Sequence, residues 1–127
     1  HCFERVVLTH QSLLYRQLAD PNPLHADPEA AQLAGFPRPI LHGMCSFGIL
    51  GLMIVTRFCG LQPARLHAMR ARFSAPVFPG ETLRCEFWRE GSVLRFRASV
   101  PTRQAIVLNQ GWAEVDESDA PAVDEPS

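Results

Sequence analysis

The 127-residue chain is long enough for one domain with a substantial core, and its 46% hydrophobic and 20% charged residues are ordinary for a soluble globular protein. The net charge of -1 hides an asymmetry, because residues 116–127 carry five acids and no base, whereas the preceding residues carry 12 arginines against 8 acids. This basic density is too low for a nucleic-acid-binding protein. Arginines would suit a phosphate-bearing ligand, although a solvated surface explains any single one equally well.

Four cysteines are widely spaced along the chain: Cys2, Cys45, Cys59 and Cys85. They form no C-x-x-C pair, so the sequence predicts neither a zinc site nor a redox motif. Free thiols in a reducing compartment, here the cytoplasm, are the expectation. The most apolar stretch, residues 43–59, would be only about 25 Å long as a helix and contains Arg57, so we expect no membrane span.

The first half of the chain predicts one strand and three helices. Residues 3–9 have strand composition, and Ser12 can cap a short helix over residues 12–18 that must stop before Pro21. A second short helix follows the capping residue Asp27 and stops at Gly35. The apolar run from residue 43 to 59 predicts a long helix with apolar side chains on all sides, and therefore a buried one.

The second half changes to a period of two, with strands expected at residues 66–73, 83–89, 93–100 and 105–115. In the third of these strands Leu94, Phe96, Ala98 and Val100 would share one face. We expect a single α+β domain over residues 1–115, in which four strands in antiparallel succession curl around the long helix. Residues 116–127 are expected to form a disordered acidic tail.

Three stretches of the sequence together resemble one known family. They are residues 20–28 (Asp-Pro-Asn-Pro-Leu-His-Ala-Asp-Pro), residues 35–43 with their Pro-Ile-Leu-His-Gly ending, and residues 70–80 (Arg-Ala-Arg-Phe-Ser-Ala-Pro-Val-Phe-Pro-Gly). The chain resembles the MaoC-like, or hydratase 2, family of hot-dog proteins over residues 15–115. The resemblance implies a hot-dog fold, with an antiparallel β-sheet wrapped around a long central helix.

The same resemblance implies an activity and a set of site residues. The expected reaction is hydration of trans-2-enoyl-CoA to (3R)-3-hydroxyacyl-CoA, or the reverse dehydration. Asp20 and His25 match the family's catalytic pair, Asn22 matches its supporting polar residue, and Gly43 matches the residue whose backbone N–H binds the thioester carbonyl. The family uses no metal and no redox cofactor, and coenzyme A enters as part of the substrate.

Elementary chemistry agrees with this assignment. A carboxylate and an imidazole that share one water can activate it and supply the proton, while an N–H at the start of an apolar helix stabilises charge on the thioester oxygen. Taken singly, Asp20 and Asn22 have a simpler explanation as turn residues, His25 as a structural histidine and Gly43 as a packing residue. Their joint spacing favours the functional interpretation. The side chain of His42 is expected to be structural.

Arg72, Phe73 and Val77 are expected to line the path of the coenzyme A moiety, although a solvated arginine and a core phenylalanine explain them equally well. Members of the family with two hot-dog repeats place the motif in the second one, and this chain holds one motif-bearing repeat. We therefore expect a homodimer whose sheets pair edge to edge, because a lone sheet would expose an unpaired edge. The substrate is an acyl-CoA, with acyl carrier protein as another possible carrier. A hot-dog thioesterase and a non-catalytic acyl-thioester-binding module are the alternatives.

Overall fold

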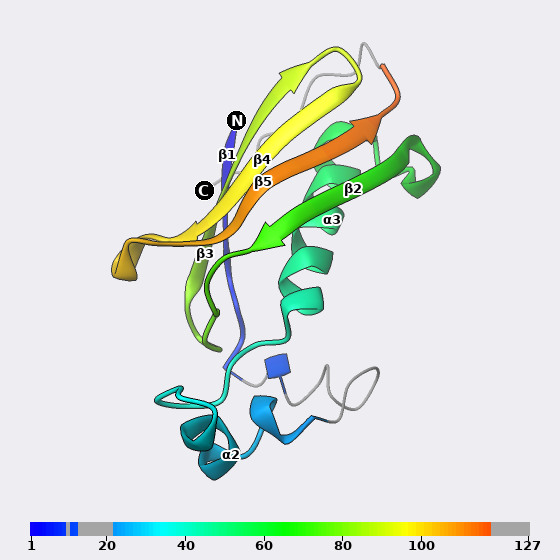
Figure 1. Ribbon diagram of the computed structural model, residues 1–127. Coiled ribbons are helices and arrows are strands. Elements are labelled where there is room, and N and C mark those ends of the chain that lie inside the picture. The colour runs from blue at the N-terminus through cyan, green and yellow to red at the C-terminus, as the bar shows by residue number, and fades with distance from the viewer. Residues whose placement is uncertain (10, 13–21, 118–127) are drawn as a thin grey trace.

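A five-stranded antiparallel sheet curves around one long helix in the computed structural model, which describes residues 1–9, 11, 12 and 22–117 (Figure 1). The strands are β1 (Cys2–Val6), β2 (Leu66–Phe73), β3 (Thr82–Glu90), β4 (Val93–Val100) and β5 (Ala105–Val115). The helices are α2 (Pro28–Leu33) and α3 (Gly43–Phe58), with short 3-10 turns at η1 (Pro23–His25), η2 (Pro63–Arg65) and η3 (Pro101–Arg103). The predicted α+β architecture is therefore confirmed.

The period-two patterns after residue 65 form the strands that they predict. In β4 the four side chains expected on one face, Leu94, Phe96, Ala98 and Val100, are all buried. The intervening Arg95 and Arg97 are exposed, as alternation along a strand requires. The first strand is shorter than predicted, because β1 ends at Val6 rather than at residue 9.

The order of strands in the sheet is β1-β3-β4-β5-β2, so the expected simple succession is wrong for β2. Strands β3, β4 and β5 do form a meander, but β2 pairs with β5 at the opposite edge from β1. Residues 74–81 connect β2 to β3 past the ends of two strands. Eight residues can span about 26 Å, which is ample for crossing three strand spacings of about 5 Å each. Periodicity identifies strands but not their partners, which is why the sequence did not predict this order.

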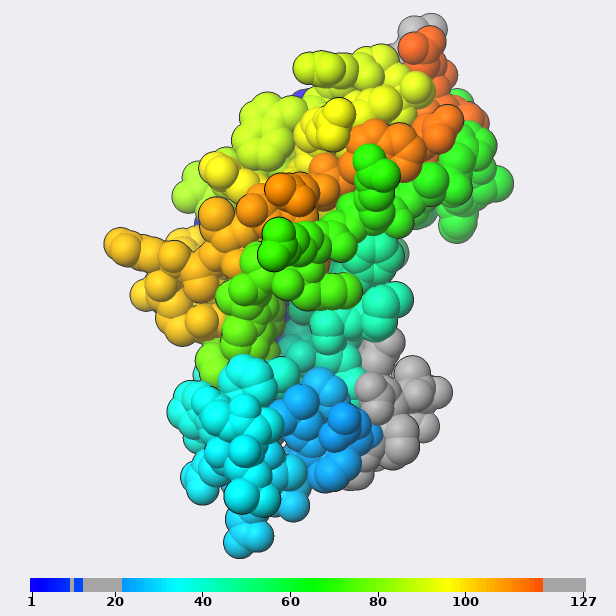
Figure 2. Space-filling view, viewed as in Figure 1, coloured from blue at the N-terminus to red at the C-terminus, as the bar shows by residue number. Residues whose placement is uncertain are grey.

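Helix α3 lies against the concave side of the sheet, but it is not buried all round as predicted. Its sheet-facing residues are Cys45, Ser46, Ile49, Leu50, Met53, Ile54 and Phe58. On the other side the relative exposure of Met44 is 58% and that of Leu52 is 49%. A single curved sheet covers only one side of a helix, and Figure 2 shows part of α3 at the molecular surface beside β2. The chain therefore presents an apolar helical face to its surroundings.

A small lobe built from residues 22–42 lies at the N-terminal end of α3 (Figure 1). Helix α2 has the predicted cap, since Asp27 Oδ1 accepts a 3.0 Å hydrogen bond from the amide of Glu29, and Gly35 ends the turn with a φ of +92°. The expected helix at 12–18 falls almost entirely outside the described residues, as does most of the acidic tail. Asp116, the first tail residue, still forms an ion pair with Arg65.

Candidate active site

His25 is fixed in the lobe by the turn that the flanking prolines favour. Asn22 caps the 3-10 turn η1, because its Oδ1 accepts a 3.0 Å hydrogen bond from the amide of Leu24. The His25 side chain is buried, with Nδ1 lying 2.8 Å from the carbonyl oxygen of Ile40. A carbonyl oxygen can only accept, so Nδ1 carries the proton of this hydrogen bond. In the neutral ring Nε2 is therefore the nitrogen with a free lone pair, as a general base requires.

Two further contacts hold the His25 ring against the segment that leads into α3. The hydroxyl of Ser12 donates to the same Ile40 carbonyl oxygen at 3.3 Å. The ring of His42 stacks on the ring of His25, with centroids 3.7 Å apart and an interplanar angle of 24°. His42 is almost completely buried. Its side chain therefore packs against the proposed base, which is a structural contact of the kind expected for His42.

Gly43 is the first residue of α3, so its amide has no acceptor within the helix. The helix dipole adds partial positive charge at this end. A Cβ on Gly43 would lie only 3.2 Å from two carbon atoms of the Phe73 ring. Glycine thus gives a ligand oxygen close access to the helix N-terminus, beside an aromatic ring.

A pocket of about 310 Å³ opens beside Gly43. Phe73 and Val77, two of the three residues predicted to line the substrate path, contribute to its wall, together with Ser46 from the second turn of α3. His25 lines a second cavity of about 260 Å³, together with Ser12. The segment 39–43 contributes residues to both cavities, and it carries both the carbonyl that binds His25 and the helix N-terminus.

Two of the predicted site residues that the structure describes, Arg72 and Asn22, do not line these two cavities. Arg72 lines a separate groove on the outer face of the sheet, with Trp88 and Arg95, because neighbouring residues of β2 point to opposite faces and Phe73 takes the inner one. The structure therefore does not bring Arg72 together with Phe73. Asp20 lies outside the described residues, and its role remains a prediction from the sequence.

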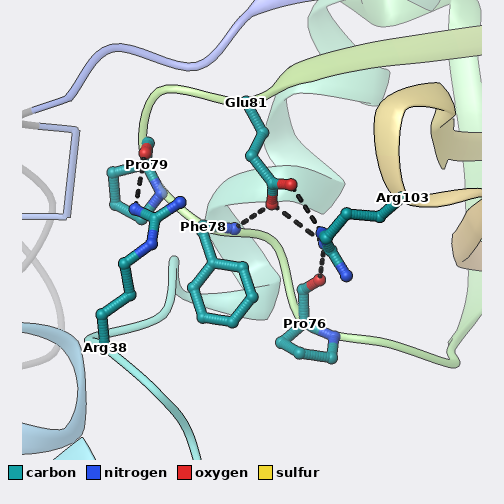
Figure 3. A network of polar contacts seen from close by, with 6 residues as sticks. All are labelled: Arg38, Pro76, Phe78, Pro79, Glu81 and Arg103. Carbon is teal, nitrogen blue, oxygen red and sulfur yellow. Dashed lines mark hydrogen bonds and ion pairs between the residues drawn. The ribbon is translucent and has the colours of Figure 1, made fainter.

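The connection between β2 and β3 is held by a polar network that sequence reasoning missed (Figure 3). Glu81 accepts hydrogen bonds from Arg103 Nε at 2.6 Å and Nη2 at 2.9 Å, and from the amide of Phe78 at 2.7 Å. Arg103 Nη2 also donates to the carbonyl oxygen of Pro76 at 2.9 Å. The Phe78 ring is contacted by the guanidinium groups of Arg38 and Arg103, at 4.6 and 5.1 Å from its centroid. No local sequence pattern links positions 81 and 103, so the sequence contains no signal from which this network could be predicted.

The network sets the charge state of Glu81. Burial by itself would raise the pKa of this carboxyl group, but the hydrogen bonds from Arg103 and from the Phe78 amide oppose that effect. The positive charges of Arg103 and Arg38 act in the same direction, and the net result is a lowered pKa. Glu81 is thus an ionised carboxylate, most of whose side chain is shielded from solvent.

Comparison with known proteins agrees with the geometry. A family model described as MaoC like domain matches residues 3–110. Peroxisomal enoyl-CoA hydratase 2 of Arabidopsis thaliana is 48% identical over 105 residues, which are 83% of this chain and 34% of that protein. The crystal structure of a MaoC-like dehydratase from Phytophthora capsici has a TM-score of 0.89 at 40% identity, and covers 92% of this chain and 40% of that one. An (R)-hydratase from A. caviae, at 23% identity and a TM-score of 0.71, shares the fold over 93% of both chains.

The chain belongs to the MaoC-like, or hydratase 2, family and has the hot-dog fold that its sequence predicts. It spans about a third or less of the length of the curated relatives it matches most strongly. The described residues contain no helix long and apolar enough to cross a bilayer.

Replacing Glu81 with glutamine should destabilise the protein in a pH-dependent way. The native pKa of Glu81 lies below its ordinary value of 4.5, so the carboxylate adds stability that is complete above that pH and is lost as the pH falls through the native pKa. Urea unfolding at a series of pH values should show Glu81→Gln less stable than the parent by roughly 1 to 2 kcal/mol at neutral pH. The difference should shrink in acid, and a constant difference would contradict this account.

Proposed function

We propose that this chain catalyses the hydration of trans-2-enoyl-CoA to (3R)-3-hydroxyacyl-CoA, or the reverse dehydration. The observation that carries the proposal is the hydrogen bond between His25 and the carbonyl of Ile40, three residues before Gly43. It ties a histidine with a free Nε2 to the segment that begins the helix. The 48% identical Arabidopsis relative, named enoyl-CoA hydratase 2, supports the same reaction.

In the proposed mechanism one water molecule adds across the double bond. Asp20 and His25 Nε2 hold the water and take a proton from it as its oxygen bonds to C3. The electron pair of the double bond moves toward the thioester carbonyl, whose oxygen gains negative charge. The amide of Gly43 and the dipole of α3 stabilise that charge, and the Asp20–His25 pair delivers the proton that it took from the water to C2, which completes the addition. Asn22 supports the turn that carries His25, through its cap on the Leu24 amide.

The substrate's thioester would lie in the pocket beside Gly43, against Phe73 and Val77. The proposed reaction requires no metal and no redox cofactor, because the acid, the base and the oxyanion donor are all protein groups. Coenzyme A is the proposed carrier, with acyl carrier protein as the other candidate. We place the reaction in the cytoplasm, a location supported by the four free cysteines.

Asp20→Asn and His25→Ala should each lower the rate of crotonyl-CoA hydration by roughly 10²- to 10⁴-fold, because each removes one partner of the water. The assay follows the loss of enoyl absorbance, with the configuration of the product determined. Thermal unfolding should show that both variants remain folded. Near-parent activity in either variant would contradict the mechanism.

Release of free thiol without loss of the enoyl chromophore in the same assay would instead indicate a thioesterase. Tight binding of the thioester with no turnover would indicate an acyl-thioester-binding module.

We also propose that two copies of the chain form a homodimer around the exposed side of α3. Met44 and Leu52 lie on the side of α3 that faces away from the sheet. About half of each side chain is exposed, which is a large exposure for apolar residues of a central helix. Strand β2 forms one edge of the described sheet, next to α3. A second copy that pairs with the β2 edge could also cover the apolar face of α3.

Leu52→Glu should convert the dimer to a monomer, because a carboxylate in an apolar interface loses its hydration without gaining a partner. Leu33→Glu is the matched control, since Leu33 lies on α2 and is 90% exposed. Light scattering should give the parent and Leu33→Glu twice the chain mass, and Leu52→Glu a single chain mass. A monomeric parent would contradict the homodimer.

A further inference from the structure

Residues 74–81, which we name the strap, link β2 to β3 and form one wall of the pocket beside Gly43. Four consecutive strap residues, from Ser74 to Val77, line that pocket. The carbonyl oxygen of Val77 also accepts a 2.7 Å hydrogen bond from the amide of Leu41, two residues before Gly43. The position of the strap therefore affects both the width of the pocket and the course of the chain into α3.

The two ends of the strap are attached through backbone amides. At one end the amide of Ser74 donates to the carbonyl of Val107 at 3.0 Å, and at the other the amide of Gly80 donates to the carbonyl of Val7 at 2.7 Å. Between these ends Pro76 and Pro79 have no amide hydrogen to donate. The middle of the strap is held through the carbonyl oxygens of these two prolines, which accept from Arg103 and Arg38, and through the amide of Phe78.

The carbonyl of Pro76 accepts its hydrogen bond from Arg103, which lies in the 3-10 turn η3 between β4 and β5. Figure 3 shows Glu81 on the other side of the same guanidinium group. Because Nη2 of Arg103 donates to both Glu81 and Pro76, and the guanidinium fork is rigid and planar, the location of Glu81 fixes where Arg103 meets the strap. Glu81 is the last residue of the strap, and its carboxylate also accepts the amide of Phe78 within the strap.

We propose that Arg103 and Glu81 are positioning residues of the active site, and that they set the binding of the acyl thioester by holding the Pro76–Val77 wall against the helix N-terminus. This inference rests on the proposed function, because its kinetic test measures KM and kcat for the proposed hydration. Neither side chain is placed in contact with the reacting atoms. Their loss should weaken the binding of substrate and transition state alike, which raises KM more than it lowers kcat.

The chain offers a matched control on the outer face of the sheet. Arg97 Nε lies 3.0 Å from Glu86 Oε1, and the Arg97 guanidinium lies 5.4 Å from the centroid of the Trp88 ring. This arginine therefore combines an ion pair with an aromatic contact, as Arg103 does. It pairs β4 with β3 and has no hydrogen bond to the strap.

The experiment compares Arg103→Met, Arg103→Lys and Arg97→Met in steady-state hydration of crotonyl-CoA. Arg103→Met should raise KM by roughly tenfold with a smaller change in kcat, and Arg103→Lys should recover little, because an ammonium cannot reproduce the fork between Glu81 and Pro76. Arg97→Met should leave KM unchanged. Equal KM values for Arg103→Met and Arg97→Met would overturn the proposal.

A second measurement separates this inference from the proposed reaction. Hydrogen exchange of the Leu41 amide, measured without substrate, should be faster in Arg103→Met than in Arg97→Met, because its acceptor Val77 adjoins Pro76. If the parent hydrates no enoyl-CoA, the proposed function fails, and the exchange rates alone decide on the positioning role. Equal exchange rates overturn that role even in an active enzyme. Should Arg103→Met not fold, Glu81→Gln takes its place in both measurements.

Discussion

The 2.8 Å hydrogen bond between His25 Nδ1 and the carbonyl of Ile40 is the contact on which the candidate site depends. It selects the tautomer in which Nε2 can accept a proton, and it fixes the imidazole to a backbone atom rather than to a mobile side chain. The segment that provides this carbonyl continues directly into Gly43. A single piece of extended chain thus sets the relative position of the base and of the helix N-terminus.

That segment is itself held from two sides. The ring of His42 covers the ring of His25 on one side, and the hydrogen bond from Leu41 to Val77 joins it to the strap on the other. The strap is anchored by Glu81 and Arg103, so a charged pair outside the two cavities supports a site whose own polar groups are few. A buried site benefits from such support, because donors held in place by the protein need no reorganisation when charge develops on the substrate.

The sequence predicted the local features of the fold and of the site because their causes are local. Alternation identified β4, and the cap at Asp27 identified α2, since each depends on residues a few positions apart. The family resemblance found His25 and Gly43, and the structure connects them through the hydrogen bond from His25 to Ile40, three residues before Gly43. Arg72 was grouped with Phe73 in one expected path, and the structure places the two on opposite faces of the sheet, as alternation along a strand predicts.

Features that depend on distant parts of the chain could not be predicted in this way. The position of β2 at the sheet edge depends on the strap, and the exposed face of α3 depends on how much of a helix one sheet can cover. The pairing of Glu81 with Arg103 joins positions 22 residues apart. Only the three-dimensional arrangement shows that this ion pair supports the pocket wall.

The central claim is that the first amide of α3 polarises the thioester carbonyl, and the carbonyl stretching frequency of bound butyryl-CoA labelled with carbon-13 at the thioester tests it directly. The comparison needs two variants, Gly43→Ala and Gly43→Pro. Both add a Cβ, and proline is tolerated at the first helical position but has no N–H to donate. The account predicts a lower frequency than in water for the parent, a smaller shift in the same direction for Gly43→Ala, whose added Cβ crowds the Phe73 ring, and complete loss of the shift in Gly43→Pro. An equal shift in both variants, or no shift in the parent, would contradict it.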